Sequence, residues 1–213
     1  MRPFGLWPLS LAAALCAPAV AAALDCADFP DGSAVDFPAA GMQTDIDIAY
    51  GPDGDLHAVW SDARSGLADI YYARSTDGGK TFGPNVKVNW SNGTATNSFI
   101  QGGPTLDVNP AGIIYVAWTD ERGGFPDTDI YVSMSTDGGV AFTQEVRANV
   151  SITAGEQSFQ AVRATPGGTI YVAWIDHSEP EERHLYLTRA LPGQPFEPER
   201  RVNRDPVWHT CEC

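Results

Sequence analysis

Residues 113–149 read IIYVAWTDERGGFPDTDIYVSMSTDGGVAFTQEVRAN, and this pattern recurs on both sides. Residues 55–89 read DLHAVWSDARSGLADIYYARSTDGGKTFGPNVKVN, and residues 169–203 form a more divergent copy, TIYVAWIDHSEPEERHLYLTRALPGQPFEPERRVN. The tryptophans at positions 60, 118 and 174 set a period of roughly 57 residues. A repeat of this size is one supersecondary unit that must bury its hydrophobic face against a neighbouring copy. We therefore expect stacked copies, and we look for function in the residues that differ between them.

Each copy contains four strand-like segments, which in the first copy are residues 44–50, 56–60, 69–74 and 85–88. They are rich in β-branched and aromatic residues, and a Pro-x-Gly turn separates the first two in every copy. No convincing helix follows the first 23 residues. Four antiparallel strands per repeat predict propeller blades, which we place at residues 41–97, 98–155 and 156–204.

A turn motif lies between the third and fourth segments, with the shared pattern S-x-D-x-G-x-x-F. The serine and aspartate side chains can bond turn amides, glycine accepts positive φ, and the aromatic ring can pack into the blade. We expect two structural turns, formed by Ser75, Asp77, Gly79 and Phe82 and by Ser135, Asp137, Gly139 and Phe142. In the third copy we align Arg189, Leu191, Gly193 and Phe196, so that the polar pair is lost there.

This motif resembles the Asp box, or BNR repeat, of sialidase-like β-propellers, and the resemblance covers residues 41–204. It implies an all-β fold with about three four-stranded blades, half of a six-bladed propeller. In that family the Asp box is a structural turn away from the catalytic site, so the resemblance implies a fold rather than an activity. The family's first catalytic arginine has no match, because residues 24–63 contain no arginine. We therefore carry over no catalytic residue, and whether the chain is an enzyme stays open.

Residues that recur in all copies are expected to build the blade: the tryptophans, Tyr71, Tyr131 and Tyr186, and Asp62, Asp120 and Asp176, with Arg64 and Arg122 as ion-pair partners. Polar residues that vary on the first strand are better ligand candidates, because first strands line the channel of a propeller. Counted back from the turn prolines, these are Asp45, Asp47, Asp107 and Arg163. Carboxylates beside an arginine suit polar ligands or cations. The alternative is a solvated channel wall.

The N-terminus has the features of a secretory signal. Arg2 precedes an apolar, alanine-rich stretch, and we assign residues 1–23 to a signal peptide and residues 24–40 to an N-terminal extension. We expect a secreted or periplasmic protein without a membrane span. The formal net charge of −14 argues against nucleic acid as a partner.

Residues 205–213 are either the start of a fourth blade or a cysteine-containing tail. Export favours disulfides, and Cys26 could pair with Cys211 or Cys213. His209 with Cys211 and Cys213 is a weak candidate for a soft-metal site, but the spacing is not a standard zinc pattern. We expect no cofactor.

Three functions remain open. The first is binding of a glycan or an extracellular protein through the channel face. The second is hydrolysis, with the chain as a fragment of an exo-α-sialidase or related glycosidase. The third is a structural module that assembles through open blade edges. Propellers close with four to eight blades, so we expect the chain to be half of a longer protein, with a dimer of three-bladed halves as the alternative.

Overall fold

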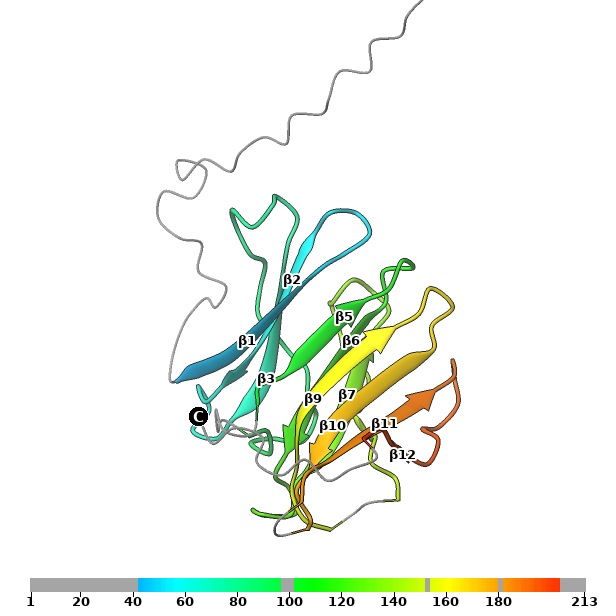
Figure 1. Cartoon of the computed structure of the whole chain (residues 1–213). Coiled ribbons are helices and arrows are strands. Elements are labelled where there is room, and N and C mark those ends of the chain that lie inside the picture. Colours follow the sequence, from blue (N-terminus) through cyan, green and yellow to red (C-terminus); the bar gives the residue numbers. More distant parts are fainter. Residues whose placement is uncertain (1–41, 97–101, 152–153, 180–181, 204–213) are drawn as a thin grey trace, which may run out of the picture. The chain divides into compact units, whose positions relative to one another are not determined.

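The computed structural model describes residues 42–96, 102–151, 154–179 and 182–203, and these form an all-β structure of three four-stranded antiparallel sheets (Figure 1). The strands are β1 Gln43–Tyr50, β2 Leu56–Asp62, β3 Asp69–Ser75, β4 Val86–Lys87, β5 Thr105–Val108, β6 Ile114–Asp120, β7 Asp129–Ser135, β8 Val146–Arg147, β9 Gln157–Ala164, β10 Ile170–Asp176, β11 His184–Ala190 and β12 Arg200–Arg201. No helix that could cross a membrane occurs in these described ranges.

Each sheet is a meander of consecutive strands: β1 to β4 form blade 1, β5 to β8 blade 2, and β9 to β12 blade 3. The three predicted blades are therefore confirmed. The first strands β1, β5 and β9 lie side by side, and the other strands of each blade extend outward from them (Figure 1). The Pro-x-Gly turns have the expected backbone, with φ of 83° at Gly54, 77° at Gly112 and 82° at Gly168.

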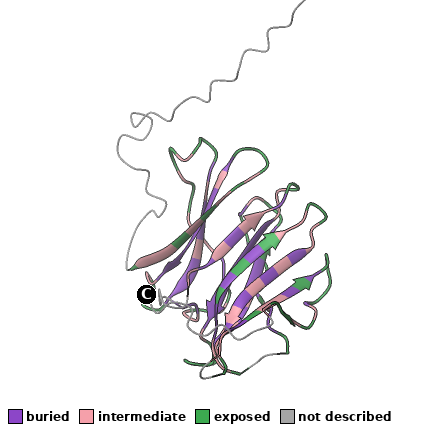
Figure 2. Ribbon diagram, viewed as in Figure 1, coloured by how far each residue is buried: buried purple, intermediate pink, exposed green. Residues whose placement is uncertain are grey.

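The hydrophobic cores lie between blades rather than within them. Val59 and Tyr72 of blade 1 pack with Val116 and Trp118 of blade 2, and a second cluster joins blade 2 to Val172 and Trp174 of blade 3. Burial is accordingly concentrated on the middle strands β2, β6 and β10 (Figure 2). The prediction that the recurring tryptophans are packing residues is confirmed, because each is almost fully buried.

The repeated tyrosines pack on these tryptophans. The ring centroids of Trp60 and Tyr71 are 6.3 Å apart, and the equivalent pairs in blades 2 and 3 are at 6.4 and 6.2 Å. Each pair is stacked, so the same tryptophan–tyrosine contact recurs in every blade.

Both S-x-D-x-G-x-x-F segments are closed by their own side chains. In blade 2, the Ser135 hydroxyl donates to Asp137 Oδ1 at 2.7 Å and accepts the Gly139 amide at 2.9 Å. In blade 1, Ser75 and Asp77 make the same contact at 2.8 Å. The bond from the Thr81 hydroxyl, followed by further turn donors, lowers the pKa of Asp77 to about 2. We call these two segments the serine–aspartate turns.

The third turn is shorter than our alignment assumed. Ala190 pairs with Ile170 as Ser135 pairs with Ile114, so Ala190 and not Arg189 occupies the serine position. Phe196 then follows after six residues instead of seven, and the turn lacks one residue. The polar pair is absent, as predicted, but the alignment of Arg189 was wrong by one position.

Several predictions concern residues outside the described part of the chain. They are the signal peptide at residues 1–23, the extension at residues 24–40, the tail at residues 205–213, and the side chains of Cys26, His209, Cys211 and Cys213. They stay predictions.

Candidate site at the bulge end of blade 3

The blades have two chemically distinct ends. The turn end carries the hairpins that follow β1, β5 and β9, together with the serine–aspartate turns. At the opposite end β1 and β9 each contain a register shift, and Asp45 and Phe159 adopt left-handed φ values of 57° and 54° at these bulges. A non-glycine residue in this region is uncommon and often marks a constrained functional segment. We call this end the bulge end.

Neighbouring blades pack closely at the bulge end. A Cβ atom on Gly103 of blade 2 would overlap Asp45, and one on Gly102 would lie 3.1 Å from the Phe159 ring. Glycine is therefore favoured where the segment before β5 passes the bulges of β1 and β9.

Two of the four channel candidates, Asp47 and Asp107, bond backbone amides of the next blade. Asp47 Oδ2 accepts the Leu106 amide at 3.0 Å, and Asp107 Oδ2 accepts the Ala164 amide at 2.7 Å. Each carboxylate thus ties its own first strand to the first strand of the next blade. Arg163 is exposed and donates to the neighbouring carbonyl of Val162 at 2.6 Å.

Within the described residues, no hydrogen bond or ion pair joins any two of Asp45, Asp47, Asp107 and Arg163. Asp47 and Asp107 have a clear structural role, and ligand binding by the four stays a prediction.

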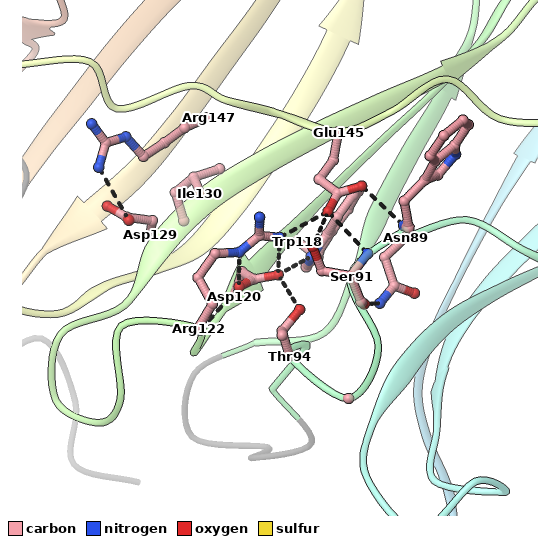
Figure 3. A network of polar contacts seen from close by, with 12 residues as sticks. Asn89, Ser91, Thr94, Trp118, Asp120, Arg122, Asp129, Ile130, Glu145 and Arg147 are labelled. Atoms are coloured by element: carbon pink, nitrogen blue, oxygen red, sulfur yellow. Dashed lines mark hydrogen bonds and ion pairs between the residues drawn. The ribbon is translucent and has the colours of Figure 1, made fainter.

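The repeated aspartates make the expected contacts with arginine. In blade 2, Arg122 donates to Asp120 at 2.7 Å and to Glu145 at 3.0 Å (Figure 3). Its guanidinium also lies 3.7 Å from the centroid of the Tyr131 ring. Arg64 is placed in the same way over Tyr71 in blade 1. These contacts are structural.

Glu145 connects blade 2 to the segment that follows blade 1. It accepts the Trp90 amide at 2.9 Å and the Ser91 hydroxyl at 2.7 Å (Figure 3). Burial alone would raise its pKa, but the hydrogen bonds from Ser91, Trp90 and Arg122 outweigh burial and lower the pKa to about 2. The Glu145 carboxylate is therefore charged, and its hydrogen bonds connect blade 2 to the segment that follows blade 1.

Blade 3 departs from this pattern at the bulge end. The amide of His177 donates to the carbonyl of Glu156 at 2.8 Å, and in blade 1 the equivalent bond joins Ala63 to Met42 at 2.9 Å. The same backbone pairing thus carries a histidine and a glutamate in blade 3 but two apolar side chains in blade 1. Ser178 replaces the arginine, and its hydroxyl bonds Asp176 at 2.7 Å.

Glu156 and His177 belong to a group of four polar residues and one phenylalanine, which we call the blade 3 cluster: Glu156, Ser158, Phe159, His177 and Arg183. His177 Nε2 lies 3.2 Å from the Ser158 hydroxyl, and its ring stacks on Phe159 with centroids 6.4 Å apart. The Phe159 side chain is 44% exposed and offers a free aromatic surface.

The electrostatics of the cluster favour uncharged forms. Burial lowers the pKa of His177 to about 4, and the positive charge of Arg183 acts in the same direction. Burial also raises the pKa of Glu156, against the opposing effects of Arg183 and Ser158. The cluster therefore presents a neutral imidazole, a hydroxyl, a carboxyl group with raised proton affinity and an aromatic face.

Sequence reasoning did not select this cluster. Aligning the residue after the repeated aspartate, which is Ala63, Glu121 and His177 in the three copies, would have singled out the histidine. Glu156 and Arg183 carry no such signal, because they come from the connections that lead into β9 and β11. In the residues that the structure covers, no group of three or more His, Cys, Asp or Glu side chains could hold a metal ion.

Comparison with known proteins identifies the fold. No family model matches the chain, and no curated protein matches it. Among solved structures, an α-L-arabinofuranosidase of Fusarium graminearum bound to an iminosugar inhibitor is similar with a TM-score of 0.61 and 13% identity, over 78% of this chain and 50% of the other.

Two further enzymes show the same relationship. An α-L-arabinanase of Penicillium chrysogenum complexed with arabinobiose has a TM-score of 0.55 and 17% identity, over 78% of this chain and 51% of the other. A Hadza microbial sialidase has a TM-score of 0.55 and 15% identity, over 76% of this chain and 38% of the other. At these identities the similarity establishes the fold alone: three blades of a β-propeller of the kind found in glycoside hydrolases. The chain spans about half the length of these proteins or less.

Proposed function

We propose that this chain binds carbohydrate at the bulge end, through the blade 3 cluster. The observation that carries the proposal is the replacement of Met42 and Ala63 of blade 1 by Glu156 and His177 of blade 3, beside the exposed ring of Phe159. Binding sites combine an apolar or aromatic surface with a few placed polar groups. The apolar face of a sugar ring can rest on Phe159, while its hydroxyls bond the imidazole and the carboxyl group.

The similar solved structures support this ligand class, because two of them hold arabinobiose or an iminosugar. We further propose, from the character of residues 1–23, that the protein is exported and meets its ligand outside the cytoplasm. N-terminal sequencing of the protein from its native host tests this point: cleavage near residue 23 is expected, and a retained Met1 would contradict it.

Hydrolysis is the second candidate, with the chain as part of a sialidase or related glycosidase. Burial raises the pKa of Glu156, which is the direction that a general acid requires. Glycosidases generally need a second acidic or nucleophilic group across the scissile bond. In the described part of the chain, the charged or hydrogen-bonding partners of the Glu156 carboxyl group are Arg183 and Ser158, and neither is an acid, so we favour binding over hydrolysis.

A glycan array followed by titration calorimetry tests the proposal. We expect saturable binding of at least one glycan, and we expect Glu156→Gln and His177→Ala each to weaken it about tenfold, as the loss of one good hydrogen bond does. Gln194→Ala at the turn end is the matched control and should bind normally. The absence of any glycan ligand, or equal affinity in all variants, would contradict the proposal.

Turnover of fluorogenic arabinosides and sialosides separates the two candidates. Binding without turnover supports the binding function. Turnover that Glu156→Gln abolishes, while the control variant retains it, would replace that function with hydrolysis.

A further inference from the structure

The interface between blades 1 and 2 is sealed at the turn end by one aromatic ring. Tyr72 is 1% exposed, packs edge-on against Phe142 with centroids 5.2 Å apart, and bonds His57 Nδ1 through its hydroxyl at 2.6 Å. A Cβ atom on Gly139 of the second serine–aspartate turn would overlap this ring. The ring thus occupies all the space between the blades at this point.

The interface between blades 2 and 3 lacks that ring. Tyr72 pairs with Val59 in blade 1, and the equivalent pair in blade 2 is Val132 with Ala117. Both replacements are smaller, and the third turn, which begins at Ala190, is one residue shorter. A cavity of about 650 Å³ lies here. Its size is in the range of small-molecule pockets.

The cavity wall is apolar and contains one unsatisfied polar group. Its main apolar side chains are Ile113, Tyr115, Val132, Ile170 and Phe196. Asn109 also lines it and is 1% exposed. The Asn109 Oδ1 atom accepts the amides of Ala111 and Ile113, both at 3.0 Å, but its buried Nδ2 has no hydrogen-bond partner among the described residues. The Nδ2 atom is fully buried, so a ligand's acceptor would reach it through a small shift of the cavity wall, and the hydrogen bond gained would favour that shift.

We propose that this cavity binds a small molecule with a single aromatic ring and a hydrogen-bond acceptor, of the phenol type. The sister interface supplies the argument for this chemistry, because the same place between blades 1 and 2 is filled by the phenol of Tyr72. The Asn109 amide then supplies the donor for the ligand's oxygen. Most of the cavity wall is apolar, which favours an aromatic ring over a sugar. The cavity lies at the opposite end of the blades from the blade 3 cluster, so the inference does not depend on the proposed carbohydrate site.

Binding of p-cresol and toluene to the full chain, measured by ligand-observed NMR and calorimetry, tests this inference. We expect p-cresol to bind more tightly than toluene. Val132→Tyr rebuilds the ring of the first interface and should abolish binding of both. Asn109→Asp keeps the Oδ1 acceptor and removes the amide donor, so it should lower the affinity for p-cresol by about tenfold and leave toluene unchanged. His177→Ala is the control and should bind both probes normally.

Should Val132→Tyr fail to fold by circular dichroism, Ile170→Phe fills the same cavity from blade 3 and should also abolish binding. The inference is overturned if p-cresol does not bind the wild type, or if it binds equally well to the folded cavity-filled variant. Loss of binding in His177→Ala alone would likewise overturn it, because the probe would then occupy the carbohydrate site.

Discussion

At the scale of single residues, the proposed site lies at positions where the three copies differ. Glu156 and His177 occupy positions that blade 1 fills with Met42 and Ala63, on the same backbone hydrogen bond. The fold does not need polar groups there, since blade 1 forms without them. Their partial burial beside an exposed aromatic ring is the reason why we propose a binding site here.

The titration of His177 is the first prediction. Its pKa in the folded protein is about 4, below the ordinary value of 6.5, so the folded state binds this proton less readily than the unfolded state. The contribution to stability is present above pH 6.5 and is lost as the pH falls towards 4. NMR of the imidazole protons should show a midpoint near 4, and His177→Asn should remove this part of the loss of stability. A midpoint near 6.5 would contradict the arrangement.

Glu145 provides a second prediction. Glu145→Gln keeps the shape but removes the charge that Arg122 and the Ser91 hydroxyl contact, and we expect a loss of about 2–3 kcal/mol in the free energy of unfolding. Because the folded pKa is lowered to about 2, the carboxylate stabilises the protein above about pH 4.5 and this stabilisation is lost as the pH falls towards 2.

Urea unfolding at pH 7 and pH 3 measures both effects of Glu145→Gln. The difference between wild type and variant should shrink at pH 3. Glu121→Gln is the control, because no side-chain hydrogen bond or ion pair of Glu121 is found in the described region. Equal stability of the Glu145 and Glu121 variants at pH 7 would show that the contacts of Glu145 contribute little to stability.

At the scale of elements, side-chain hydrogen bonds within the serine–aspartate turns stabilise the connection between the third and fourth strands of a blade. Ser135 both donates to Asp137 and accepts from Gly139. Ser135→Ala removes the two bonds together, and we expect a loss of about 1–2 kcal/mol in thermal or urea unfolding. Thr136→Ala, at the exposed neighbouring position, should change stability by less than about 0.5 kcal/mol. Equal effects of the two variants would argue against the role of the serine.

Substitutions at two glycines of these turns distinguish the cost of backbone strain from the cost of a steric clash. Gly78 has φ of 75° and open space around it, so Gly78→Ala should cost about 1 kcal/mol from the left-handed backbone alone. Gly139 has φ of 89°, and a Cβ atom there would also overlap the Tyr72 ring, so Gly139→Ala should cost about 1–3 kcal/mol more. Thermal unfolding of both variants checks that Gly139→Ala is the more destabilising. The reverse result would mean that the Tyr72 ring moves aside at little cost.

At the scale of the whole molecule, the two end blades leave sheet faces without a neighbouring blade among the described residues. On blade 1, Ile46, Ile48 and Tyr50 are exposed by 59%, 61% and 70%, opposite the face that packs on blade 2 (Figure 2). On blade 3, Leu185 and Val202 are also exposed. The outermost strands are only two residues long, so we expect any self-association to use these apolar faces rather than the strand edges.

We therefore expect the isolated chain to self-associate in a concentration-dependent way, measured by light scattering coupled to size exclusion. Ile48→Lys should shift the equilibrium towards monomer by placing a charge on this face. Val140→Lys, at a turn position that is 75% exposed, should have no effect. A monomer at all concentrations would contradict the expectation.

The fold was largely predictable from the chain itself. In blades 1 and 2, the Trp-x-Asp and S-x-D-x-G-x-x-F segments form hydrogen bonds that span two to four residues, so their roles follow from sequence spacing alone. The third turn was misaligned because glycine and phenylalanine were matched without regard to strand pairing, which is a non-local property.

The sequence by itself determined the blades, their number and the turns that close them, because alternation, turn residues and short-range hydrogen bonds are encoded within each copy. Only the tertiary structure decided what the varying residues do. It assigned Asp47 and Asp107 to backbone amides of the next blade, brought Glu156 together with His177 and Arg183 from two connections, and left a cavity beside Val132. Each of these depends on contacts between segments about 20 to 60 residues apart, whose geometry the pairing and stacking of strands alone define.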